Sequence, residues 1–228
     1  MEVALHQMKD NLPQQWKPLW MRLGDDSSVG GKTALNTPAG KNFIGTFYQP
    51  KAVLTAVSYL RTQEPRVHAS GLVEALKMAA CLDRVLFDDL SAAVPDLLMF
   101  ESSHVIPLLL RAVELKAQIV AKDEREESER LVLNYGHTVG HAIESGEAYN
   151  LLHGEAIGLG MLAEAAFAEQ AFSYSREIRE RLKQVLIELG MPHEWNKMQI
   201  DYTALGKDKK RREQKLRIPV VPEIGRYE

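Results

Sequence analysis

Three histidines in the middle of the chain have a spacing that suits metal or proton chemistry. His137 and His141 are four residues apart, so on a helix their imidazoles lie on one face, about 6 Å from each other. They can share a metal ion, or one can bind a metal while the other transfers protons. His153 follows ahead of another predicted helix, and a catalytic zinc ion usually has three protein ligands. Thr138 stands where a zinc-protease motif has glutamate, which excludes that motif. Two polar helix residues that never meet a metal are the alternative interpretation.

Glu74 and Lys77 form a second candidate group, three residues apart within an otherwise apolar helical pattern. This spacing places both side chains on one helix face. If the pair is exposed, it contributes little to stability. If Glu74 points inward, its carboxylate can complete a metal-ligand set of one glutamate and two histidines.

Charged residues gather in two further places. Lys116 lies on a long apolar helical pattern, with the charged run 123–126 and Arg130 after it, which is typical of a solvated helix end. The segment 207–217 is strongly basic and contains no interleaved aromatic residues. It therefore indicates an exposed tail or weak phosphate binding rather than a module for single-stranded nucleic acid.

Helical periodicity dominates the chain after residue 64. Helices are predicted over 65–90, about 105–121, 133–145, 154–172 and 176–189. Small and turn-forming residues before position 43 predict a loop whose backbone N–H groups can meet a ligand. The β-prone runs 43–48 and 52–57 predict two strands.

Two nucleotide-binding motifs are excluded. No GxGxxG segment occurs in the chain, although a dinucleotide-binding βαβ unit normally begins with one. The GGKT segment at 30–33 is not a P-loop, because Asp26 stands where the first glycine of that motif would be.

Composition restricts the class of protein. The 228 residues are 45% hydrophobic and 26% charged, with a formal net charge of −3, which is ordinary for a globular protein and excludes a whole-surface binder of nucleic acid or anionic membranes. The single cysteine, Cys81, fits a reducing compartment. No apolar run approaches the roughly 20 residues needed to cross a bilayer, and the first residues lack the apolar core of a signal peptide. We expect a cytoplasmic protein with neither a nucleic-acid nor a membrane partner.

Seven segments, in order between residue 26 and about 225, resemble the signature blocks of the 3-dehydroquinate synthase family. These segments are DSSVGGKTALN, GKNFIGTFYQP, GLVEALK, KAQIVAKDERE, LNYGHTVGHAIE, LHGEAIGLGM and DKK. The resemblance implies a mainly α chain. A helical metal- and substrate-binding domain is expected over 64–228, and a loop and strand remnant of the family's N-terminal α/β half over 26–63. Residues 1–25 are expected to be a divergent segment.

The resemblance also assigns roles to residues. It implies a catalytic divalent metal, zinc or cobalt, held by Glu74, His137 and His153. His141 and Glu126 match residues that handle protons, and Lys77 matches a catalytic residue that contacts the substrate. Residues that hold the hydroxyls, carboxylate and phosphate of the substrate match Asp26, Lys32, Asn42, Lys116, Arg130, Asn134 and Lys209. Positions that touch NAD match Lys41 and a turn formed by Ser70, Gly71, Leu72 and Val73.

The implied reaction is a carbon–oxygen lyase step of the shikimate pathway, leading to aromatic amino acids. It converts 3-deoxy-arabino-heptulosonate 7-phosphate to 3-dehydroquinate and phosphate. NAD+ takes a hydride from a ring alcohol, phosphate is eliminated, the hydride returns, and the opened ring closes again as a carbocycle. The partner is thus a small sugar acid phosphate, and a homodimer is expected if the fold is complete.

The N-terminal part departs from the family pattern. Only 25 residues precede Asp26, where the family has a glycine-rich NAD-binding half, and Asp10 falls where the family has an arginine that reaches a neighbouring subunit. A fragment or mis-started reading frame is favoured over a partial protein that works with another chain. Two other functions stay open. One is a different sugar phosphate cyclase, and the other is a catalytically silent metal-binding fragment. Polyol dehydrogenases share the fold but lack the pairing of GGKT with GKN.

Overall fold

The protein is mainly α-helical, as predicted, with a single hairpin among the residues that the structure describes. The computed structural model describes residues 29–37, 40–51, 53, 57–100, 102–148, 150–203 and 217–228. The helices are α3 (Pro65–Leu82), α4 (Arg84–Ala92), α5 (Val94–Met99), α6 (Ser102–Lys122), α7 (His137–Gly146), α8 (His153–Phe172) and α9 (Glu177–Glu188). Short 3-10 helices are η3 (Val57–Thr62), η4 (Glu129–Asn134) and η5 (Trp195–Lys197), and the strands are β1 (Lys32–Thr37) and β2 (Gly40–Phe47).

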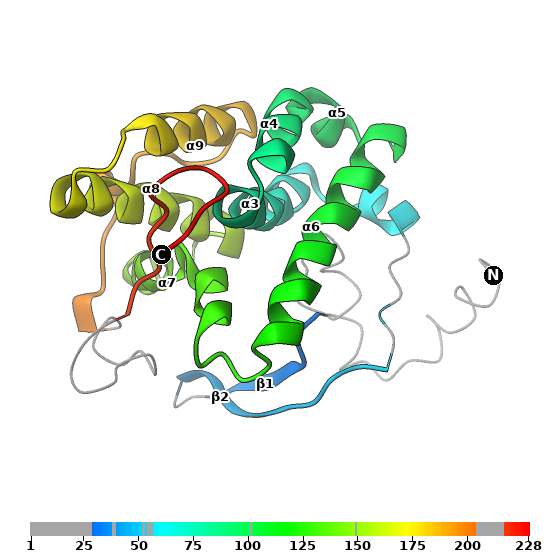
Figure 1. Cartoon of the computed structure of the whole chain (residues 1–228), viewed down its shortest axis with the longest axis horizontal. Coiled ribbons are helices and arrows are strands. Elements are labelled where there is room, and N and C mark those ends of the chain that lie inside the picture. The colour runs from blue at the N-terminus through cyan, green and yellow to red at the C-terminus, as the bar shows by residue number, and fades with distance from the viewer. Residues whose placement is uncertain are drawn as a thin grey trace.

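Helix α3 forms the centre of the helical layer and packs against α4, α6 and α8 (Figure 1). Its apolar residues lie on several sides of the helix, and Val73, Leu76 and Ala79 are all buried. A helix that is apolar on most sides must be surrounded by other elements. The charged pair on α3 is therefore carried into the interior by the burial of its apolar neighbours.

The helix predicted over 65–90 is interrupted at Asp83, which is a correction to the sequence analysis. Asp83 is extended, with φ −154° and ψ 100°, and its side chain accepts a hydrogen bond from Leu86 N–H at 3.0 Å. This is the geometry of an N-cap residue. The apolar periodicity continues across the break, so periodicity alone did not reveal it.

The helix predicted over 133–145 begins later, at His137. The 3-10 helix η4 ends at Asn134, and Gly136 adopts a left-handed conformation with φ 76° as the N-cap of α7. A side chain at position 136 would also collide, because its Cβ would lie 2.7 Å from the carbonyl oxygen of Ile157. Glycine is the residue that satisfies both requirements. His137 thus lies at the first position of a helix rather than inside one.

The three remaining predicted helices are confirmed as α6, α8 and α9. Helix α8 is rich in glycine and alanine and packs closely against α7. Helix α9 ends before Gly190, whose φ of 70° is typical of a helix C-terminus. No helix in the described part of the chain combines the length and apolarity needed to cross a membrane.

The strands β1 and β2 pair in antiparallel fashion, with Lys32 opposite Phe47 and Leu35 opposite Ile44. The predicted strand 43–48 is thus confirmed in the main. Residues 32–37 are a strand rather than the predicted loop, because the segment pairs with β2, with one irregularity in register between Leu35 and Thr37. The prediction over 52–57 lies largely outside the described residues, but Val53 is not in a strand and η3 begins at Val57. The hairpin lies beside the loop that leaves α6 (Figure 1).

Candidate metal and substrate site

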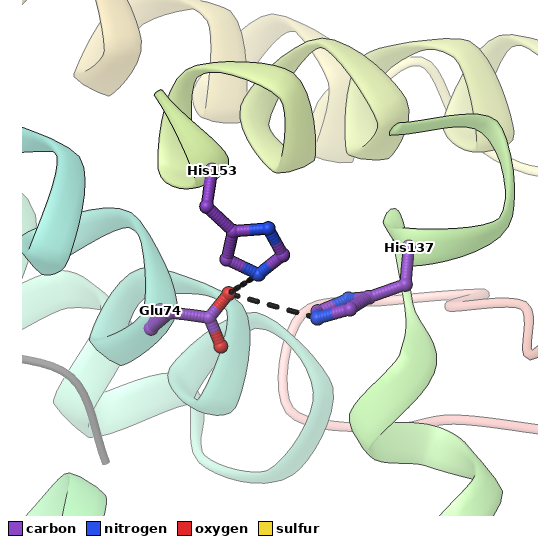
Figure 2. A group of neighbouring side chains, drawn as sticks. All are labelled: Glu74, His137 and His153. Carbon is purple, nitrogen blue, oxygen red and sulfur yellow. Dashed lines mark ion pairs between the residues drawn. The ribbon is translucent and has the colours of Figure 1, made fainter. Parts of the chain in front are cut away.

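Glu74, His137 and His153 converge on one point from three different helices (Figure 2). The Oε1 atom of Glu74 lies 3.8 Å from His137 Nε2 and 3.6 Å from His153 Nε2. Two ligand atoms bound to a tetrahedral zinc ion at about 2.1 Å are separated by roughly 3.4 Å. The three donor atoms therefore have the spacing of a zinc-binding set.

The two oxygens of Glu74 have different surroundings. Oε2 accepts a hydrogen bond from Lys77 Nζ at 2.6 Å, whereas Oε1 is buried with no hydrogen-bond partner among the described residues. A buried carboxylate oxygen without a partner is costly unless a cation completes its surroundings. Burial raises the pKa of Glu74, but the positive charge of Lys77 and the proximity of His153 outweigh burial and hold this pKa below its usual range. Glu74 is thus a charged ligand with one oxygen to offer.

The exposed interpretation of Glu74 and Lys77 is wrong. Their side chains are 7% and 4% exposed. Lys77 therefore compensates a buried charge instead of forming a surface pair.

His137 has the protonation state that a metal requires. Burial, followed by the charge of Lys77 and the neighbouring imidazoles of His153 and His141, lowers the pKa of His137 well below its usual value. Its Nδ1 lies 3.2 Å from the carbonyl oxygen of Tyr135. With Nδ1–H donating to this oxygen, Nε2 keeps a lone pair that faces Glu74.

His141 lies beside this group on the exposed side of α7. The centroid of its ring is 5.4 Å from that of His137 and 5.8 Å from that of His153. The predicted common face of His137 and His141 is therefore confirmed. The neighbouring Glu144 was missed by the sequence analysis, although it follows His141 by one helical turn on the same face.

Contacts between α3 and α8 hold Glu74 close to His153. Gly154 N–H donates to Ser70 Oγ at 3.0 Å, and a Cβ at position 154 would lie 1.9 Å from the Ser70 carbonyl oxygen. Arg66 binds both carboxylate oxygens of Glu155 at 2.7 Å. The sequence analysis did not predict this pair, because nothing local shows that Arg66 and Glu155 meet.

A buried carboxylate also joins α7 to α8. Glu164 of α8 accepts hydrogen bonds from Gly136 N–H at 2.7 Å and from Val139 N–H at 3.3 Å. These N–H groups lie at the start of α7 and have no partner within the helix. Glu164 thus fixes the first turn of α7, which carries His137, and it too was missed by the sequence analysis.

A second cluster contains Lys32, Glu126 and Asn134, all predicted to contact the substrate or its protons. Lys32 Nζ lies 2.5 Å from Glu126 Oε2, and Asn134 Nδ2 donates to Glu126 Oε1 at 2.5 Å. Glu126 has a left-handed backbone, with φ 60°, which is uncommon for a residue with a side chain and typical of functional loops. The cluster joins the hairpin to the loop between α6 and η4.

Arg130 is buried, which corrects the interpretation of its segment as a solvated helix end. Its side chain donates to the carbonyl oxygens of Glu124, at 2.5 Å, and of Gly30, at 2.8 Å. Burial lowers the pKa of Arg130, against the nearby charges of Glu126 and Asp123. In this structure, Arg130 attaches the hairpin to the loop after α6. Its predicted contact with substrate stays a prediction.

Asp123 organises the same loop by accepting backbone N–H bonds from Glu127, Ser128 and Arg130 at 2.7–3.0 Å. Burial raises the pKa of Asp123, but these hydrogen bonds outweigh burial and lower it from 3.8 to about 2. A carboxylate with a depressed pKa stabilises the fold above its unfolded pKa, and this contribution is lost as the pH falls through the folded pKa.

We therefore expect Asp123→Asn to lower the free energy of unfolding by about 1–3 kcal/mol at pH 7. The difference from wild type should shrink to roughly half at pH 3, since wild type then loses part of a charge effect that the variant lacks at every pH. Urea unfolding at the two pH values measures this difference. An equal deficit at both values would contradict the role of the charge.

Several predicted residues cannot be placed with their side chains. Asp26 and Lys209 lie outside the described residues, and only the backbone of Lys41 and Asn42 is described, within β2. Lys116 lies on α6 with its positive charge acting on Glu74, which places it on the side of the metal group.

The segment from Ser70 to Val73 is helical, not a turn, because it lies inside α3. Leu72 is buried and Val73 is completely so. The predicted contacts of Ser70, Gly71, Leu72 and Val73 with NAD remain a prediction.

A large cavity of about 640 Å³ lies elsewhere, between the C-terminal half of α8, α9 and η5. Its lining includes Glu169, Arg179 and Trp195 and none of the candidate site residues. Cavity size therefore does not locate the chemistry here, whereas the convergence of donor atoms does.

The fold resembles those of solved synthases. A 2-epi-5-epi-valiolone synthase from Streptomyces hygroscopicus, solved with NAD+ and Zn2+, matches with a TM-score of 0.79 at 24% identity, over 91% of this chain and 59% of that chain. A 2-deoxy-scyllo-inosose synthase, solved with carbaglucose-6-phosphate, NAD+ and Co2+, matches with a TM-score of 0.78, also at 24% identity and the same coverage. These likenesses confirm the expected fold.

Sequence comparison identifies the family. A 3-dehydroquinate synthase of Thermodesulfovibrio yellowstonii is 41% identical over 206 residues, and one of Citrifermentans bemidjiense is 44% identical over 205 residues. The matched regions cover 88% and 89% of this chain and 57% of each relative, so the chain spans little more than half the length of these curated relatives. The profile described as 3-dehydroquinate synthase N-terminal matches residues 22–70, and the one described as 3-dehydroquinate synthase C-terminal matches residues 71–211, more than half of the chain. The chain therefore belongs to the 3-dehydroquinate synthase family.

Proposed function

We propose that this chain carries the metal- and substrate-binding part of a 3-dehydroquinate synthase and catalyses that reaction with NAD. The reaction is the conversion of 3-deoxy-arabino-heptulosonate 7-phosphate to 3-dehydroquinate and phosphate, in the shikimate pathway and in the cytoplasm. The single observation that carries the proposal is the buried Oε1 of Glu74, which lacks a hydrogen-bond partner among the described residues and faces two imidazole nitrogens.

The residues present fit a divalent metal. One carboxylate and two imidazoles are ligands that zinc accepts in catalytic sites, with further positions left for substrate or water. The two solved synthases hold NAD+ together with Zn2+ or Co2+, which supports the same cofactors here. When bound, the metal would polarise a substrate alcohol and NAD would take up and return its hydride.

The protein itself supplies charge and proton transfer. Lys32 is 45% exposed while paired with Glu126, so an anionic group of the substrate can compete with the carboxylate for the ammonium group. Displaced from Lys32, Glu126 becomes a proton acceptor at the substrate. His141 lies on the exposed side of the metal group, where it can pass a proton to or from the departing phosphate.

The test is release of phosphate from the heptulosonate phosphate by the purified chain, with NAD+ and zinc. We expect phosphate release that depends on NAD+ and is abolished in His137→Ala. The zinc affinity of this variant should fall by more than roughly 100-fold, because removing only the outer partner of a ligand already costs up to about 100-fold. His193→Ala is the matched control, since His193 also lies near a carbonyl oxygen two residues before it but lines the distant cavity.

Two outcomes would overturn the proposal. A folded chain that binds zinc but releases no phosphate would be a catalytically silent metal-binding fragment. Release of phosphate with a carbocyclic product other than 3-dehydroquinate would identify a different sugar phosphate cyclase. The 41–44% identity to relatives that are named 3-dehydroquinate synthase favours 3-dehydroquinate. Light scattering of the same sample tests the expected homodimer.

A further inference from the structure

We propose that Glu144 is a positioning residue that orients His153 toward the metal. The imidazole of His153 lies between two carboxylates. Its Nε2 is 3.6 Å from Glu74 Oε1, and its Nδ1 is 3.4 Å from Glu144 Oε1. The inference rests on the proposed metal site, because it concerns how one ligand of that site is held.

The contrast in burial indicates which group holds the other. The side chain of His153 is 43% exposed at the first position of α8, whereas that of Glu144 is 6% exposed inside α7. An exposed imidazole at a helix terminus can rotate about its side-chain bonds, but a buried carboxylate on a packed helix is fixed. Glu144 is therefore the rigid partner, and His153 is the group whose orientation it determines.

The ring orientation has a chemical consequence. A carboxylate beside Nδ1 accepts its N–H, so the proton stays on Nδ1 and Nε2 presents its lone pair to the metal. Histidine ligands generally have such an outer partner, and its removal typically costs 10–100-fold in metal affinity. His137 has the Tyr135 carbonyl oxygen for this purpose, at 3.2 Å from its Nδ1.

The competing interpretation is a second cation site. His141, Glu144 and His153 each offer a donor atom, and these atoms lie within 4.8 Å of one another. A second ion there would require Nδ1 of His153 to lose its proton, so that one ring bridged two metals. The positioning role needs no such step and uses the ordinary neutral imidazole.

Zinc affinity, measured by competition with a chromophoric chelator, tests the proposal. We expect binding by Glu144→Ala to be 10–100-fold weaker than wild type. Glu144→Gln should lose less, since its amide oxygen can still accept from Nδ1–H. Glu147→Ala is the matched control, because Glu147 lies at the same end of α7 but accepts a hydrogen bond from Gln199 N–H at 2.8 Å. The zinc affinity of this control variant should equal that of wild type. Equal affinities of Glu144→Ala and wild type would overturn the proposal.

A second measurement separates this proposal from the proposed function. Long-range ¹H–¹⁵N spectra of the metal-free chain report which nitrogen of His153 carries the proton. We expect Nδ1–H in wild type and a mixture of the two tautomers in Glu144→Ala. If wild type binds no zinc, the proposed function fails while the tautomer still decides the role of Glu144. Two zinc ions in wild type and one in Glu144→Ala would replace the positioning role with a second cation site.

Discussion

Lys77→Met is expected to lower the free energy of unfolding of the metal-free chain by about 3–5 kcal/mol at pH 7. The substitution keeps an apolar chain of similar length but removes the ammonium group 2.6 Å from Glu74 Oε2. Glu74 then stays buried with its strongest compensating charge removed, and its other oxygen also lacks a hydrogen-bond partner in the described part of the chain. Urea unfolding at neutral pH, with chelator present, measures the loss.

The pH dependence and the effect of zinc identify the cause. Without Lys77, we expect burial to outweigh the remaining charges of His153 and Lys116 and so to raise the pKa of Glu74. A group whose pKa is higher in the folded than in the unfolded state stabilises the fold fully below the unfolded pKa, and this stabilisation is lost as the pH rises. The stability of the variant should therefore recover toward that of wild type in acid. Zinc supplies a positive charge beside Oε1, so saturating zinc should stabilise the variant more than it stabilises wild type.

The matched control is Lys197→Met. Lys197 pairs with Glu194 at the same spacing of three residues and at 2.7 Å, but both side chains are more than half exposed. An exposed pair contributes little to stability, so this variant should unfold nearly as wild type does. If both variants lost the same amount, burial of Glu74 would not be the cause.

Gly160→Ala is expected to lower the free energy of unfolding by about 3 kcal/mol or more, together with zinc affinity. A Cβ at position 160 would lie 2.0 Å from the carbonyl oxygen of Gly136 and 2.7 Å from the backbone nitrogen of Gly140. Both atoms belong to the backbone and cannot move aside as a side chain can, so α7 and α8 must separate. The free-energy cost of this separation should be at or above the usual range for overpacking. The separation moves His137 away from His153, which explains why stability and zinc affinity should fall together.

Gly158→Ala, in the same helix, is the control for this prediction. Its Cβ would meet only the side chain of Leu186, with the nearest atom at 2.9 Å, and that flexible end can move. Alanine is also favoured over glycine in a helix by about 1 kcal/mol, which offsets the crowding. Thermal unfolding and chelator competition on both variants give the comparison. Equal behaviour of the two would show that the close approach of α7 and α8 is not needed.

Features that depend on neighbouring residues along the chain were predicted correctly. The periodicity over 105–121, 154–172 and 176–189 corresponds to α6, α8 and α9, and the common face of His137 and His141 follows from helical geometry. The breaks at Asp83 and Gly136 were missed. They were missed because the apolar periodicity continues through both positions. The cap formed by the Asp83 side chain and the left-handed conformation of Gly136 change the path of the backbone without changing that pattern.

What the sequence by itself determined is the family and the three candidate ligands that the structure brings together. The spacing of two histidines and the order of the signature segments were sufficient for both, because they are properties of the chain read in one dimension. Only the tertiary structure decided that Glu74 and Lys77 point inward and that Arg130 attaches the hairpin. It likewise brings Glu144 to 3.4 Å from His153 and places Glu164 at the first turn of α7. A helical pattern defines a face, but the burial of that face depends on which distant helix packs against it. Residues such as Glu74 and His153, 79 positions apart in the chain, meet only when that packing is complete.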